Sequence, residues 1–353
     1  MEFGIALATT TESWRVTQQA EALGLAEAWF YDTQLLNPDV FIGMALAADR
    51  TSRIRLGTGV LIPSNRLAAV AANCFASLNR MAPGRIDFGV GTGFTGRRTM
   101  GQTALPLGRM RRYIEEVQGL LRGETVLTSL EDGEHPVRFL NPELGLINLD
   151  DPVPLHVSAM GPKSRRLTAA LGAAWLNFSG SVEPALRHIE DMRRAWHDAG
   201  HPENNLRSTL FALGCVLDEG EPADSPRAMA QAGPCAAVVL HDLAETSVAG
   251  SLDGKMPPAL VSAVERYRAV WQGFPEAERH LHNHSGHLMF LREDERELLT
   301  AELIRALTFT GTREDLAERI RRLGDAGYDQ FVVQLVEGQE QALDDWAEVF
   351  ERV

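Results

Sequence analysis

A carboxylate and two amides are the side chains best placed for chemistry in the first third of the chain. Asp32 follows a predicted strand at 27–31, and Gln34 and Asn65 lie on neighbouring loops. A carboxylate there can accept a hydrogen bond from a ligand, or act as a general base if burial raises its pKa. The two amides would orient a carbonyl or amide group of a substrate. The alternative role for Asp32 is that of a helix cap or loop anchor.

Four histidines fall within the eight residues His280-Leu-His-Asn-His-Ser-Gly-His287. Imidazoles at this density can ligate zinc or iron, but we expect a loop here, with no obvious carboxylate partner. We therefore predict no metal. His284 or His287 is expected to face the substrate as a proton donor or a hydrogen-bonding wall. Solvated loop histidines are the alternative.

A glycine-rich loop follows the alternating apolar run of a strand at 85–90. Glycines 91, 93 and 96 spell G-x-G-x-x-G, and such glycines let backbone N–H groups approach a phosphate or a flat ring closely. The dinucleotide-binding version belongs to the first βα turn of its domain, with an acidic residue about 20 positions later. Here three βα units come first, and Glu115 and Glu116 fall within a helical pattern. A dinucleotide site is therefore disfavoured.

Strands alternate with helices along most of the chain, which indicates parallel strands joined by right-handed crossovers. We predict an α/β fold, a TIM-like (β/α)8 barrel with insertion segments, with an open doubly wound sheet as the alternative. Residues 236–240 could add a further strand, and 293–307 is expected to be helical. The predicted barrel strands are 3–8, 27–31, 54–62, 85–90, 155–159, 174–178, 208–217 and 327–335.

We predict one domain over 1–353, with an excursion near 124–154, expected as a small hairpin, and another near 241–292. Active sites of such barrels lie at the carboxyl ends of the strands. That position would bring together the loops after 31, 62, 90, 158 and 178.

The chain is acidic, with a formal net charge of -14, and this argues against nucleic acid or an anionic membrane as a partner. The first residues lack a basic region, and no apolar run is long enough to span a bilayer. Cys74, Cys215 and Cys235 are widely spaced and odd in number, which is typical of buried thiols. We expect a cytoplasmic protein.

Three segments together resemble the bacterial luciferase-like family of flavin- or deazaflavin-dependent oxidoreductases. They are Arg53-Ile-Arg-Leu-Gly-Thr-Gly-Val, Pro83-Gly-Arg-Ile-Asp-Phe-Gly-Val-Gly-Thr-Gly and Leu155-His-Val-Ser-Ala-Met-Gly-Pro-Lys-Ser. Asp32-Thr-Gln and the 91–96 loop look closest to the branch named after methylenetetrahydromethanopterin reductase. That branch contains both coenzyme F420 enzymes and FMN-dependent monooxygenases.

The resemblance implies a coenzyme site over the end of the barrel. The third strand would bulge at 58–60 under the isoalloxazine ring, and the glycine loop at 91–93 would line the ribityl chain. Backbone amides of 160–163 and 179–180 would hold the phosphate. A helix opening at Gly161-Pro162 independently suits an anion, and Lys163 would add a point charge. The implied coenzyme residues are Thr58, Gly59, Val60, Gly91, Thr92, Gly93, Ser158, Met160, Gly161, Pro162, Lys163, Ser179 and Gly180.

The preferred expectation is a two-component monooxygenase. A separate flavin reductase would supply reduced FMN, which reacts with O2 so that a small organic substrate is oxygenated. The alternative is a coenzyme F420-dependent oxidoreductase that transfers hydride, although an acidic chain suits the polyglutamate tail of F420 less well. A non-catalytic flavoprotein and a metal-dependent barrel hydrolase are further alternatives. A homodimer or higher homo-oligomer is a family expectation.

Overall fold

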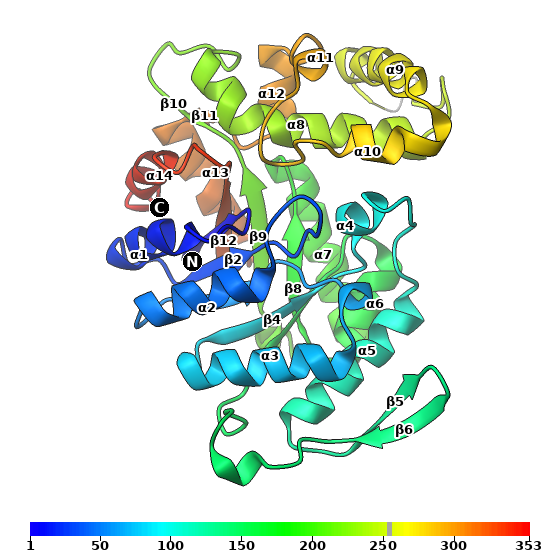
Figure 1. Cartoon of the computed structure of the whole chain (residues 1–353). Helices are drawn as coiled ribbons and strands as arrows, with labels where there is room; N and C mark the ends of the chain where they lie inside the picture. Colours follow the sequence, from blue (N-terminus) through cyan, green and yellow to red (C-terminus); the bar gives the residue numbers. More distant parts are fainter. Residues whose placement is uncertain (253–255) are drawn as a thin grey trace.

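Eight parallel strands close into a barrel in the computed structural model, which describes residues 1–252 and 256–353 (Figure 1). The strand order is β1-β12-β9-β8-β7-β4-β3-β2, so β1 pairs with both β2 and β12 and leaves no open edge. The TIM-like barrel prediction is confirmed. The strands are β1 Glu2–Leu7, β2 Glu27–Phe30, β3 Arg55–Thr58, β4 Ile86–Val90, β7 Leu155–Ser158, β8 Ala174–Phe178, β9 Ser208–Leu213 and β12 Gln330–Leu335.

Amphipathic helices surround the barrel, each with one apolar face toward the strands. In α7, for example, Val182, Ala185, Ile189, Met192 and Trp196 are buried, which is the spacing of one helix face. The surrounding helices are α1 Ser13–Ala22, α2 Val40–Arg50, α3 Ala68–Met81, α5 Leu107–Leu121, α6 Pro162–Ala170, α7 Val182–Asp198, α13 Arg313–Asp325 and α14 Ala342–Phe350, with the short α4 Phe94–Arg98 after β4.

The barrel interior is layered. A polar layer at the amino ends of the strands joins Asp87 to Arg55 through two hydrogen bonds of 2.7 and 2.8 Å, and to His156 at 3.1 Å. Above it, the fully buried indole of Trp29 fills the centre. Glycines make room for this ring: a Cβ on Gly57 would lie 2.5 Å from Trp29 Cε3, and one on Gly89 would lie 2.9 Å from Trp29 Cζ3. Only the layer above Trp29 can face a ligand at the carboxyl ends of the strands.

An inserted group of helices lies at the top of Figure 1, on the side toward which the β9 arrow points. It has its own apolar cluster, which includes Leu240, Val264 and Ile304. The predicted strand at 236–240 was wrong, because these residues lie inside α8. A short apolar run cannot by itself distinguish a buried helix from a strand, and Ser225 caps the helix through Ala228 N–H. The insert comprises α8 Pro226–Thr246, α9 Pro258–Gly273, α10 Arg279–Asn283, α11 Glu293–Arg296 and α12 Ala301–Leu307.

The predicted excursions are present with shifted bounds. Residues 124–154 contain an antiparallel hairpin of β5 Val126–Leu130 and β6 Gly133–Val137. The second excursion begins earlier than residue 241, since α8 starts at Pro226, and the helix expected over 293–307 is divided into α11 and α12. Two short strands, β10 Val216–Leu217 and β11 Gly311–Thr312, pair at the base of the insert. Within the described ranges, we find no helix with the length and apolarity needed to cross a membrane.

Candidate active site at the mouth of the barrel

Asp32 is buried immediately after β2 and is held by a neighbouring loop. Its carboxylate accepts hydrogen bonds from Ile62 N–H at 3.0 Å and from Arg66 Nη1 at 2.8 and 2.9 Å. Burial raises the pKa of Asp32, while the Arg66 guanidinium and the Ile62 N–H oppose that rise. Arg66 was missed by sequence reasoning, because the sequence does not show which arginine reaches Asp32. The geometry favours a loop anchor over a free general base.

Gln34 and Asn65 lie together, as the sequence predicted for neighbouring loops. Asn65 Nδ2 donates to Gln34 Oε1 at 2.7 Å, and its other contact is with Asp32 Oδ2 at 3.3 Å. Gln34 Nε2 donates to the carbonyl of Gly96. These amides therefore connect the loops after β2, β3 and β4, and both side chains are only partly buried.

The third strand bulges where the family resemblance implied it. Regular pairing of β3 ends at Thr58, the Gly59–Val60 peptide is cis, and Leu61 then forms an isolated bridge to Val90. Thr58 is fully buried, and its Oγ1 donates to Gly89 O at 2.7 Å. Val60 packs against the apolar cluster at the mouth, which contains Tyr31 and is also contacted by Phe178.

Packing explains each glycine of the G-x-G-x-x-G loop. A Cβ on Gly91 would lie 2.7 Å from Val60 Cγ2, and one on Gly96 would lie 2.4 Å from Ile62 Cδ1. Gly93 has a φ of 73°, a conformation that glycine adopts without strain, and precedes the five-residue helix α4. Thr92 between them is partly buried. The loop is built to lie close against the bulge of the third strand.

The helix α6 begins beside the carboxyl end of β7, where Ser158 is partly buried. Ser164 Oγ accepts the N–H of Gly161 at 3.2 Å, and Pro162 has no N–H. The donors that remain at this helix start are the backbone N–H groups of Lys163 and Ser164, which have no intrahelical acceptor by position. Lys163 and Met160 are exposed, and nothing lies within 4 Å of a Cβ placed on Gly161.

The turn after β8 packs closely against the insert. A Cβ on Gly180 would lie 1.9 Å from the carbonyl oxygen of Leu307, so this glycine permits the close approach of the insert. Ser179 is buried, and its Oγ donates to Ser181 O at 2.8 Å. Both residues already have protein partners that account for their types.

Apolar side chains from the barrel and the insert meet at the mouth. Leu288 and Met289 pack against the cluster that contains Trp29 and Tyr31. The Tyr31 hydroxyl is buried and has no hydrogen-bond partner in residues 1–252 and 256–353. Burial raises the pKa of Tyr31, so it stays protonated near neutral pH. Tyr31 was not among the site residues predicted from the sequence, which included its neighbour Asp32. Its place at the end of a strand, next to a polar loop, could have indicated a site residue.

The structure brings His284 and His287 to the same end of the barrel as the other predicted residues. His287 Nε2 lies 3.0 Å from Thr95 Oγ1 on α4. Burial and the nearby His241 lower the pKa of His284 to about 3, and burial also lowers that of His287. Both rings are therefore neutral near pH 7 and poorly suited to act as imidazolium proton donors. His282 instead stacks on Phe274 at the surface.

Comparison with known proteins agrees with this architecture. The chain is 27% identical over 342 residues to a 5,10-methylenetetrahydromethanopterin reductase of Archaeoglobus fulgidus, covering 94% of this chain and 92% of the relative. It superposes on the coenzyme F420-dependent tetrahydromethanopterin reductase of Methanopyrus kandleri with a TM-score of 0.71 and 18% identity, covering 99% and 96% of the two chains. It also superposes on the FMN-bound oxygenating constituent of 3,6-diketocamphane monooxygenase from Pseudomonas putida, with a TM-score of 0.64, 13% identity and coverages of 99% and 97%.

A family match covers nearly the whole barrel. Residues 4–330 match the luciferase-like monooxygenase family, a range that contains six barrel strands in full, β1 from its third residue and only the first residue of β12. The match agrees with the resemblance inferred from the motifs around Gly59, Gly91 and Gly161. This chain belongs to the luciferase-like monooxygenase family and is an oxidoreductase.

Proposed function

We propose that this oxidoreductase binds reduced coenzyme F420 at the mouth of its barrel and transfers hydride to a small organic substrate. The observation that carries the proposal is the similarity to the Archaeoglobus reductase along 94% of the chain. The fold match to an F420-dependent reductase supports the same preference. FMN-dependent oxygenation was the preferred expectation from the sequence, and we now place the F420 hypothesis first because of this similarity.

The residues at the mouth fit a flavin-type tricycle with a phosphate. The helix start at Lys163 and Ser164 offers backbone N–H groups to an anion, and Lys163 adds a positive charge. Lys163 is one of only two lysines in the chain, the other being Lys255. The open space beside Gly161 leaves room for a ligand at this helix start. The bulge at 58–60 and the loop at 91–93 would support the tricycle from the β3 and β4 side.

When bound, coenzyme F420 supplies the hydride, and the chain binds, orients and shields the reactants. Val60, Phe178, Leu288 and Met289 pack against one cluster and would form an apolar wall that excludes water from the bound reactants. The Tyr31 hydroxyl lies beside this wall, so it can donate a hydrogen bond to a carbonyl oxygen of the substrate as negative charge develops there. Asp32 and Arg66 hold the loop that carries Asn65, so that its amide and that of Gln34 can orient the substrate.

FMN-dependent monooxygenation is the second candidate. It is favoured by the family description and by the fold match to an FMN-bound monooxygenase component. The net charge of -14 also suits the shorter FMN better than a polyglutamate tail. In this case a separate flavin reductase would deliver reduced FMN, and the same apolar wall would exclude water from the site.

The two candidates separate in one binding experiment. Purified protein is titrated with F420 and with FMN, each in the oxidised and the reduced form, while tryptophan fluorescence is followed. We expect reduced F420 to bind at least tenfold more tightly than reduced FMN. Tighter binding of reduced FMN, together with substrate-dependent O2 consumption when a flavin reductase is added, would establish the second candidate. Binding of neither coenzyme would overturn both.

A further inference from the structure

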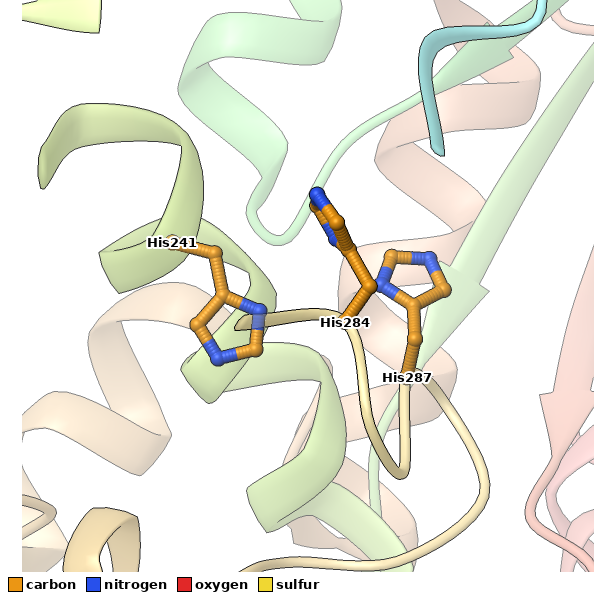
Figure 2. A group of neighbouring side chains, drawn as sticks. All are labelled: His241, His284 and His287. Carbon is orange, nitrogen blue, oxygen red and sulfur yellow. The ribbon is translucent and has the colours of Figure 1, made fainter. Parts of the chain in front are cut away.

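Three histidine rings converge between the insert and the mouth of the barrel. His241 projects from α8 toward the loop after α10, on which His284 and His287 lie beside each other (Figure 2). One nitrogen from each ring lies within 4.8 Å of the other two. The ring centroids of His241 and His284 are 6.3 Å apart, and those of His284 and His287 are 6.1 Å apart. The third histidine comes from a position 43 residues before His284, outside the run at 280–287.

The outer nitrogens of two rings are already held by protein groups. His241 Nε2 lies 2.5 Å from Glu295 Oε1, and His287 Nε2 lies 3.0 Å from Thr95 Oγ1. A ring whose Nε2 donates in this way presents Nδ1 as a lone pair, and such outer partners are typical of metal-binding histidines. Glu295 is in turn held by Arg292 Nη2 at 2.9 Å.

The other ring nitrogens of the three histidines have no hydrogen-bond partner among the described residues. Nδ1 of His241, Nδ1 of His287 and both nitrogens of His284 are buried, with no hydrogen-bond partner among the residues that the structure describes. A buried polar atom without a partner costs roughly 1–3 kcal/mol. One such nitrogen from each of the three rings, gathered within 4.8 Å, indicates a ligand that accepts lone pairs.

The local charges permit a cation at this point. The carboxylate of Glu245 lies 3.5 Å from His284 Nε2 and is bound by Arg98 at 2.9 Å. Asp242 on the same helix lies 3.6 Å from Arg98. A divalent ion would therefore meet three imidazoles and nearby carboxylates that offset the two arginines Arg98 and Arg292.

We propose that His241, His284 and His287 form a binding site for a divalent transition-metal ion, with a fourth position open to water or Glu245. Three imidazoles suit zinc, iron, cobalt or nickel better than magnesium or calcium. Bonds of about 2.0–2.1 Å to zinc place tetrahedral ligand atoms roughly 3.4 Å apart. The three nitrogens now lie within 4.8 Å of one another, and small rotations of the His284 and His287 side chains would shorten these separations to the value needed.

The ion would fix the loop over the mouth of the barrel. Leu288 and Met289 directly follow His287 and pack against the Tyr31 cluster, so a metal tie to α8 holds these side chains in place. This site does not depend on which coenzyme the protein uses. It also differs from a hydrolase site built on the run at 280–287 alone, since His280 and His282 take no part in the cluster.

The test is metal binding to the intact protein after treatment with a chelator. Zn²⁺ is titrated by calorimetry, and Co²⁺ is titrated while its visible absorption is recorded. We expect one ion per chain and a Co²⁺ spectrum typical of nitrogen ligands. His287→Asn should weaken Zn²⁺ binding about 100-fold or more, and Thr95→Val, which removes an outer partner, roughly 10-fold. His282→Asn is the matched control and should bind like the parent chain.

Folding of each variant is checked without metal by circular dichroism and thermal unfolding. If His241→Asn does not fold, the contribution of the histidines to metal binding is measured with His287→Asn, because residue 287 lies on the loop. Zn²⁺ should raise the Tm of the parent protein and of His282→Asn, but not that of His287→Asn. Binding of no ion by the parent protein, or equal binding by His287→Asn and His282→Asn, would overturn the proposal.

Discussion

Removing Arg66 is expected to expose the electrostatic cost of burying Asp32. Asp32 is 4% exposed and Arg66 donates to both of its carboxylate oxygens, so Arg66→Met would leave a buried, unpaired carboxylate. Breaking a buried pair in this way costs roughly 3–5 kcal/mol. Unfolding entropy of about 2.1 cal/mol/K per residue gives roughly 0.7 kcal/mol/K for 353 residues, so Tm should fall by roughly 4–7 °C at pH 7.5.

The sign of the pH dependence follows from the pKa of Asp32, which burial raises in the folded protein. A raised pKa means that the folded state binds the proton more tightly, so stability is greatest below the unfolded pKa and is lost as pH rises through the folded one. Arg66→Met raises this pKa further. The loss relative to the parent protein should therefore be large at pH 7.5 and small near pH 4.

The assay is thermal and urea unfolding of the parent protein, Arg66→Met, Asp32→Asn and the double variant at both pH values. In the Asp32→Asn background, Arg66→Met should cost less than about 1.5 kcal/mol, because no buried charge is left unpaired and the ion pair lost with Asp39 is partly exposed. An equal cost in the two backgrounds would refute the assignment of Asp32 as a charged loop anchor. So would a loss of the same size at pH 4 and pH 7.5.

Three further predictions concern the mouth and the layer below it. Tyr31→Phe should lower the rate of hydride transfer about 10²–10³-fold with little change in coenzyme affinity, measured by single-turnover absorbance; an unchanged rate would exclude the hydroxyl from catalysis. Lys163→Ala should weaken coenzyme binding roughly 2–5-fold, less so in high salt, in fluorescence titrations; a salt-independent effect would contradict a charge contact. Gly89→Ala places a Cβ 2.0 Å from Thr58 O and should destabilise the fold by about 3 kcal/mol or more. Gly161→Ala is the control, because nothing lies within 4 Å of the added Cβ, and its unfolding midpoint should be nearly unchanged.

The barrel was predictable from the sequence because its signals are local and repeated. Each strand is a short apolar run followed by a helix with one apolar face, as in α7, and the order of units fixes parallel pairing. The misassigned segment 236–240 lacked such a signal, since an uninterrupted apolar run inside α8 has no distinguishing period.

The site was predictable only at the level of loops. Strand ends showed that Asp32, Gln34 and Asn65 would meet, because carboxyl ends of parallel strands share one side of a barrel. The partners Arg66 and His241 were missed, since contacts between distant parts of the chain depend on how the insert and the loops pack. The glycines at 91, 96 and 180 resemble ligand-binding glycines in the sequence, yet neighbouring side chains or carbonyl groups already explain them.

The layering around Trp29 divides the barrel into two parts that can change independently. The hydrogen-bonded network of Arg55, Asp87 and His156 lies below a fully buried indole, so we expect substitutions at the mouth to leave it unchanged. The fold can therefore tolerate new side chains at the mouth while the lower half preserves stability. A barrel built in this way is a suitable starting point for laboratory evolution toward new substrates, with Trp29 as the boundary below which residues are left unchanged.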